Sequence, residues 1–181
     1  SDLTPLIGIH THMADKLNGN PALTAKQVAR LQKELPGCLI VFNRPTSPAV
    51  GKKAEAIIEA AIRHAIDKPT ENLTDGDFEK VKKLMLVCEN LADISALSKL
   101  KNLEVLNLYG NQISDLRPLI GLKKLTLLDL RINRVDDLAP LAGLANLKTL
   151  RLKNNQVSDI SPLEKLAKLE SLDLANNRVN Q

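Results

Sequence analysis

A short stretch near the start of the chain, HTHMAD at residues 10–15, has side chains that could bind a metal ion. On a strand, His10 and His12 would point to the same face, because successive side chains alternate between the two faces. Two imidazoles with the carboxylate of Asp15 nearby would suit zinc. The alternative is an exposed or frayed stretch without metal. We favour that alternative because the one other histidine, His64, lies far away in the sequence.

Other patterns typical of catalysis do not occur. The sequence has no glycine-rich phosphate loop, no GxSxG elbow and no cysteine–histidine pair. Cys38 and Cys88 stand in apolar surroundings without CxxC spacing, which favours buried apolar side chains over a disulfide or a metal site. The sequence therefore predicts no enzyme, no catalytic residue and no cofactor.

Composition excludes two further classes of function. The 181 residues are 44% hydrophobic and 25% charged, with a net charge of +4 and only 2% aromatic residues. Bases would have almost no rings on which to stack, so we do not expect nucleic-acid binding. The longest apolar runs, such as CLIVF, fall far short of the roughly 20 residues that cross a bilayer. We therefore expect no membrane insertion.

The second half of the chain is an internal repeat. Four copies begin at Leu103, Leu125, Leu147 and Leu169, which sets a constant period of 22 residues. A weaker copy begins at residue 81 and has Glu89 where the others have asparagine. The other asparagines of this phase are Asn111, Asn133, Asn155 and Asn177.

Each copy reads as one short strand and one turn. In LNL and LDL the leucines alternate with polar residues, so the leucines enter a core and the residues between them face outward. Parallel stacking of successive strands would bury leucines that no single copy can bury alone. The asparagine after the strand would turn inward and satisfy buried backbone groups. Aspartate before Pro118, Pro140 and Pro162 predicts the start of a short helical turn.

The pattern LxxLxLxxNxIxDxxPLxxL resembles the leucine-rich repeat, in the 22-residue form of bacterial internalin-like proteins. The resemblance covers residues 81–181, which we interpret as five repeats with an incomplete last one. It implies an α/β solenoid. Short parallel strands would form a sheet on the concave face, and short helical turns would lie on the convex face.

Residues 52–80 are expected to form a helical cap at the N-terminal end of the repeats. GKKAEAIIEAAIRHAIDK places apolar residues at helical spacing, and Thr74 followed by Asp77 predicts the start of a second, short helix. Such a cap would cover the first strand edge of the solenoid. It resembles the helical cap of internalin-like proteins.

Residues 1–43 carry a second, weaker pattern. Ser1, Asp2, Pro5, Leu6, Leu17 and Asn20 align with Ser158, Asp159, Pro162, Leu163, Leu174 and Asn177, although His12 and Asp15 replace expected leucines. A helix opened by Thr24 and Gln27 and the strand CLIVF then resemble a C-terminal cap of bacterial leucine-rich repeat domains. We interpret residues 1–43 as a terminal repeat plus C-cap, and residues 44–51 as a linker.

Three arrangements explain a closing cap that precedes its repeats. The chain is a piece of a longer tandem array, or it is permuted so that residues 1–43 close their own array, or residues 1–43 cap the repeats of a neighbouring chain. The short linker makes closure within one chain marginal. We favour the first arrangement and retain the third as an alternative.

The outward-facing strand residues are the candidate binding surface. The repeat phase predicts three exposed columns, led by Lys83, by Met85 and by Val87, and an apolar group beside a basic centre is typical of a protein interface. The candidate partner-binding residues are Met85, Val87, Val105, Asn107, Tyr109, Leu127, Asp129, Arg131, Thr149, Arg151, Lys153 and Asp173. The alternative is a solvated strand surface with pairing between neighbouring charges.

Two functions fit this pattern. The first is a non-enzymatic protein-recognition module that binds a protein through the concave face. The second is an architectural or self-associating unit in which residues 1–43 cap the open end of an array, in the same chain or a neighbouring one. The sequence itself does not set a compartment, and the resemblance to internalin-like proteins favours a secreted or cell-surface location.

Overall fold

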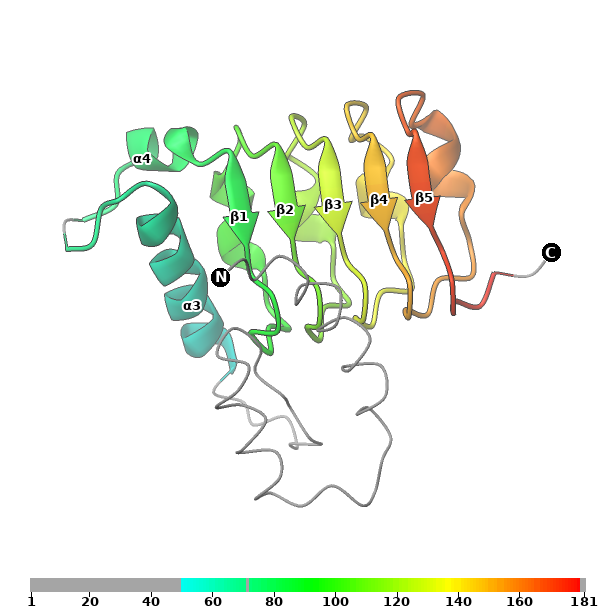
Figure 1. Ribbon diagram of the computed structural model, residues 1–181, viewed down its shortest axis with the longest axis horizontal. Coiled ribbons are helices and arrows are strands. Elements are labelled where there is room, and N and C mark those ends of the chain that lie inside the picture. The colour runs from blue at the N-terminus through cyan, green and yellow to red at the C-terminus, as the bar shows by residue number, and fades with distance from the viewer. Residues whose placement is uncertain (1–49, 71, 180–181) are drawn as a thin grey trace, which may run out of the picture. The chain divides into compact units, whose positions relative to one another are not determined.

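The computed structural model describes residues 50–70 and 72–179 (Figure 1). Residues 1–43, with the predicted terminal repeat, the C-cap and the candidate metal ligands His10, His12 and Asp15, lie outside the described residues, as does most of the predicted linker.

A five-stranded parallel sheet runs along the solenoid in the order β1-β2-β3-β4-β5. The strands are β1 (Lys83–Met85), β2 (Val105–Asn107), β3 (Leu127–Asp129), β4 (Thr149–Arg151) and β5 (Ser171–Asp173). Neighbouring strands pair with a shift of one repeat, so the central Leu84, Leu106, Leu128, Leu150 and Leu172 lie side by side. The register predicted from the 22-residue period is therefore confirmed.

Leucines of all repeats form one continuous core behind the sheet. The central strand residues Leu106, Leu128 and Leu150 are fully buried. Since each lies against its counterparts in the neighbouring repeats, no repeat completes the burial of its own leucines, and stability comes from the stack.

Short 3₁₀ turns cover the convex side. They are η1 (Ser95–Lys99), η2 (Arg117–Leu119), η3 (Ala139–Leu141) and η4 (Ser161–Lys165). An aspartate Oδ1 accepts the backbone N–H two residues on at each turn, for example Asp137 from Ala139 at 2.8 Å and Asp159 from Ser161 at 2.8 Å. That hydrogen bond lowers the pKa of Asp159. The predicted helical turns are confirmed.

The asparagine ladder, Asn111, Asn133, Asn155 and Asn177, joins each repeat to the one before it. Asn133 Nδ2 donates to the carbonyls of Leu108 (2.9 Å) and Leu130 (3.1 Å), which belong to successive repeats. Asn133 Oδ1 accepts the N–H of Ile113 at 2.9 Å. One buried amide thus satisfies backbone groups on both sides of a repeat boundary.

The turn between each strand and its ladder asparagine places one residue in the left-handed region. These residues are Cys88, Gly110, Ile132, Asn154 and Asn176. Glycine and asparagine suit this conformation, whereas the β-branched Ile132, with φ of 55°, is strained there. At Gly110 a side chain would also approach Cys88 Sγ to within 2.8 Å.

Two helices cap the first repeat. Helix α3 (Val50–Ala65) contacts β1 and η1, and it buries Ala54, Ile58 and Ile62 in the core. Helix α4 (Asp75–Lys80) begins after Thr74, whose backbone N–H and hydroxyl donate to Asp77 Oδ2 at 2.9 and 2.8 Å. The predicted helices are confirmed.

The carboxylate of Asp77 joins helix α4 to the segment that connects it with helix α3. Lys68 Nζ, which lies between them in the sequence, binds Asp77 Oδ2 at 2.8 Å, and Lys80 Nζ binds Oδ1 at 3.0 Å. The Lys68 ammonium and the Thr74 donors hold the pKa of this carboxyl far below its usual range.

Glu89 stands at the ladder position of the first repeat, and the structure shows why asparagine is dispensable there. Asn111 and Asn133 each donate to a carbonyl of the preceding repeat, at Leu86 (2.7 Å) and Leu108 (2.9 Å). In the described part of the chain, helix α3 rather than a preceding repeat contacts β1, so Glu89 has no preceding repeat to bind. Its backbone N–H is itself bound by Asn111 Oδ1 at 3.1 Å.

We predict that Asn133→Ala lowers the free energy of unfolding by about 1 to 3 kcal/mol, because buried backbone groups of two repeats lose their partner. Denaturant unfolding measures the change, with Gln156→Ala as a control at a half-buried amide side chain. Equal midpoints for the parent and Asn133→Ala would contradict a structural ladder.

Candidate binding face

The sheet carries three columns of outward-facing residues. Strand pairing aligns the first column, Lys83, Val105, Leu127, Thr149 and Ser171, and the second, Met85, Asn107, Asp129, Arg151 and Asp173. The third column lies two residues after the end of each strand and consists of Val87, Tyr109, Arg131, Lys153 and Ala175. The carbonyls of Tyr109, Arg131, Lys153 and Ala175 each accept a backbone N–H of the preceding repeat, so the pairing between repeats continues beyond the strands. The structure thus brings the sequence-predicted residues together on one face.

The apolar part of this face lies over β1 to β3. Met85 is 57% exposed in the second column, and the half-buried Val105 and Leu127 pair with each other in the first column. Val87 is also half-buried. A cluster of accessible apolar side chains on a rigid sheet is the kind of surface that proteins bind.

The second column is partly scaffold, which sequence reasoning missed. Asn107, Asp129 and Asp173 each turn a side-chain oxygen back to accept the backbone N–H two residues on, at 3.0, 3.1 and 3.1 Å. These bonds satisfy backbone donors just after the strands. The recurrence of Asn or Asp at this phase was the sequence signal for this role.

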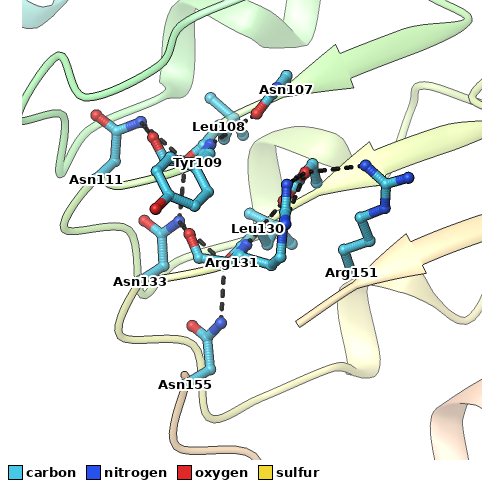
Figure 2. A network of polar contacts seen from close by, with 10 residues as sticks. Asn107, Leu108, Tyr109, Asn111, Leu130, Arg131, Asn133, Arg151 and Asn155 are labelled. Carbon is cyan, nitrogen blue, oxygen red and sulfur yellow. Dashed lines mark hydrogen bonds and ion pairs between the residues drawn. The ribbon is translucent and has the colours of Figure 1, made fainter. Parts of the chain in front are cut away.

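Asp129 was predicted to be exposed, and this is wrong, because the residue is fully buried. Its carboxylate accepts Arg131 Nε at 2.9 Å and Arg131 Nη2 at 2.6 Å, in the two-pronged geometry that suits a guanidinium (Figure 2). Arg151 Nη1 lies 3.5 Å from Asp129 Oδ2. The hydrogen bonds that Arg131 donates to the Asp129 carboxylate raise the pKa of Arg131.

Tyr109 was also predicted to be exposed in the third column, and it is only 6% exposed. The guanidinium carbon of Arg131 lies 5.2 Å from the centre of its ring, within range of a cation–π contact. Tyr109 does not belong to the leucine core. The predicted register is therefore right at this position, and only the predicted exposure is wrong.

Arg151 is an accessible basic residue of the second column. Its side chain is 44% exposed, and its ion pair with Asp129 is a long contact at 3.5 Å. Arg131, at 24% side-chain exposure, is by contrast held on two sides by Asp129 and Tyr109. Arg151 is thus held less tightly than Arg131.

Within residues 50–70 and 72–179, no three His, Cys, Asp or Glu side chains gather as metal ligands would. None of the helices in this part of the chain combines the length and the apolar character of a membrane span.

The repeat pattern decides the family. The family described as "Leucine Rich repeats (2 copies)" matches residues 79–121, 101–143 and 145–181. The chain belongs to the leucine-rich repeat family. Proteins of this family are generally protein-interaction modules, and its internalin-like members are typically non-enzymatic.

Among solved structures, an internalin (InlF) of Listeria monocytogenes is 37% identical, with a TM-score of 0.67, over 74% of this chain and 39% of that one. An internalin C2 of the same organism is 24% identical, with a TM-score of 0.51, over 69% of this chain and 85% of that one. This leucine-rich repeat protein is therefore of the bacterial internalin-like type, and it spans about two fifths of the InlF structure.

A third similar structure is the leucine-rich repeat ectodomain of a plant receptor kinase from Arabidopsis thaliana, solved in complex with CASPARIAN STRIP INTEGRITY FACTOR 2. It is 27% identical, with a TM-score of 0.51, over 59% of this chain and 14% of that one. No curated protein matches the sequence.

We predict that Asp129→Ala lowers the free energy of unfolding by about 3 kcal/mol, because Arg131 loses the partner that compensates its burial. Arg151→Ala should cost less than about 1 kcal/mol, as exposed ion pairs do. Thermal and denaturant unfolding of both variants measures the contrast. Similar losses for the two would contradict the division between a scaffold pair and an accessible arginine.

Proposed function

We propose that this leucine-rich repeat protein is a non-enzymatic recognition module that binds a protein through the concave face. The observation that carries the proposal is that Met85, 57% exposed, and the half-buried Val105 and Leu127 lie on the same face of one sheet, in its second and first columns. A partner that binds there loses little free energy to ordering the surface, because the strands already hold these residues in place.

Arg151 adds charge to this apolar group. Its guanidinium lies in the same column as Met85, two strands beyond Asn107, and it is accessible at the surface. We infer that the partner presents an apolar side chain to Met85 and Leu127 and a carboxylate to Arg151.

The remaining predicted contact residues divide into two groups in this proposal. Val87, Thr149 and Lys153 are half-buried and belong to the surface that a partner would cover. Asn107, Tyr109, Asp129, Arg131 and Asp173 shape that surface through contacts within their own repeats and, between Tyr109 and Arg131, across neighbouring repeats. A secreted or cell-surface location is part of the proposal and rests on the likeness to internalins.

The test is a binding screen of the purified chain against a panel of extracellular and cell-surface proteins, repeated with two variants. Met85→Asp with Leu127→Asp places charge in the apolar cluster and should abolish binding of any protein that the parent binds. Ile120→Asp is the matched control, because Ile120 is a large exposed apolar residue, at the end of a convex turn.

A second pair of variants tests how much the charge of Arg151 contributes to binding. Arg151→Glu should weaken the same interaction at least about tenfold, whereas Arg134→Glu, at an exposed position outside the three columns, should leave it unchanged. Retained binding by the double variant, or loss of binding by Ile120→Asp, would contradict recognition by the concave face.

A further inference from the structure

The connections that lead from the convex turns back to the strands form a basic edge of the solenoid. They are residues 100–104, 120–126, 142–148 and 166–170. Backbone N–H groups of Thr126, Lys148 and Glu170 each donate to a carbonyl of the preceding connection at 2.8 Å, so the connections stack on one another. Four lysines of this edge, called the lysine row here, are Lys101, Lys123, Lys124 and Lys168.

The opposite edge has the reverse charge. It consists of the connections from the strands to the turns, residues 86–94, 108–116, 130–138 and 152–160. Its carboxylates are Glu89, Asp93, Asp115, Asp136, Asp137 and Asp159, against the basic Arg131, Arg134 and Lys153. An anionic polymer is therefore attracted to one edge of the solenoid and repelled by the other.

Both glutamates in the basic connections are already neutralised. Glu170 Oε1 lies 3.1 Å from Lys148 Nζ, and Glu104 Oε1 lies 3.6 Å from Lys82 Nζ. The members of the lysine row are all exposed, and no carboxylate within residues 50–70 and 72–179 forms an ion pair with them. The row thus carries positive charge that the described residues do not balance.

Two glycines make room for lysines of the row. A side chain at Gly121 would come within 2.5 Å of Lys101 Nζ, and one at Gly143 within 2.5 Å of Lys123 Nζ. Lys123 Nζ also donates to the Gly143 carbonyl at 3.1 Å. Neither glycine has a positive φ, so the backbone does not require glycine at these positions. The space over each glycine holds the ammonium group of the preceding repeat.

The glycines occur only where the preceding repeat supplies a lysine. At these two phases the sequence has Glu79 with Lys99, Lys101 with Gly121, Lys123 with Gly143, and Ala145 with Lys165. The space is therefore kept free in the two repeats in which an ammonium group fills it. Charges that are already positioned lose less free energy to ordering when an anion binds.

Asparagine side chains connect the row across further repeats. Asn146 Nδ2 donates to the Lys123 carbonyl at 2.9 Å, and Asn146 Oδ1 accepts Lys168 Nζ at 2.8 Å. Asn102 Nδ2 donates to the Glu79 carbonyl at 2.9 Å. Each amide uses one of its two N–H groups in these contacts, and the other can donate to a hydroxyl of a ligand.

We propose that the lysine row binds a linear sulfated polysaccharide that lies along this edge across successive repeats. Strands advance by roughly 4.8 Å per repeat, so the row from Lys101 to Lys168 extends over about 15 Å, and a small anion would meet only part of it. The ammonium groups bind the sulfate charges, and the side-chain amides between them bind sugar hydroxyls.

The composition of the edge favours this polymer over nucleic acid or a membrane. Proteins bind single strands through aromatic rings and read guanine mainly through arginine, and the four connections contain neither residue type. Binding at a membrane surface relies on an apolar face beside the basic residues. In the four connections, Ile120 is the one large hydrophobic residue that is exposed.

The affinity of the full chain for heparin, a sulfated polysaccharide, tests the proposal when it is measured at several salt concentrations. Lys101→Gln with Lys123→Gln should weaken binding at least about tenfold and reduce its salt dependence, because fewer counterions are released. Lys53→Gln with Lys83→Gln is the matched control. It removes the same charge at exposed positions on α3 and in the first column of the sheet.

A second variant moves the ammonium groups without changing the charge. Gly121→Ala with Gly143→Ala places methyl groups where Lys101 Nζ and Lys123 Nζ lie, and it should weaken heparin binding at least about threefold. Gly76→Ala is its control, because a methyl group there meets no atom closer than 3.9 Å. Circular dichroism of each variant verifies that the repeats remain folded.

Three further ligands distinguish the sources of negative charge. Desulfated heparin should not bind, and duplex DNA and phosphatidylserine vesicles should bind more weakly than heparin at the same salt concentration. The proposal would be overturned by a parent that does not bind heparin, by equal losses in the two lysine variants, or by unchanged binding of the glycine double variant. Tighter binding of DNA or of vesicles than of heparin would overturn it as well.

Discussion

Each asparagine of the ladder binds backbone groups of two repeats, and the rest of the structure depends on this junction. Asn111, Asn133 and Asn155 are buried, and their amides reach carbonyls in their own repeat and in the preceding one. The leucines supply most of the apolar burial. The amides provide hydrogen bonds to the backbone polar groups of the tight turn after each strand, which would otherwise be buried without partners. Because the turn is fixed, the next strand starts in register and the outward columns align.

The same junction explains why the two ends of the stack differ. At the first repeat, helix α3 contacts the first strand. Among the described residues no earlier repeat offers backbone groups that an asparagine at position 89 would bind, so Glu89 can stand there. In the last described repeat, Asn177 binds backward to Leu152, and Leu172 is 41% exposed. A stack of this kind is stabilised by nearest neighbours, so each repeat depends on those beside it.

Much of this architecture was predictable from the sequence because the period of 22 residues is constant. Strand register, the inward leucines, the asparagine ladder and the aspartate-led turns all follow from residue phase. The burial of Asp129 and of Tyr109 was not predictable in this way, because it depends on Arg131, which contacts both. The phase of a residue places it on a face, whereas its exposure depends on the length and charge of its particular neighbours.

Native-state amide hydrogen exchange of a dilute sample tests the central role of the ladder most directly. The N–H groups of Ile113, Val135 and Val157 donate to the ladder oxygens of Asn133, Asn155 and Asn177. If the junctions hold neighbouring repeats together, Ile113 and Val135 should be among the slowest amides to exchange, and Val157 should exchange faster because its partner lies in the last repeat. Faster exchange at Ile113 and Val135 than at the convex-turn amides of Leu122 and Leu144, or slowest exchange at Val157, would contradict this account.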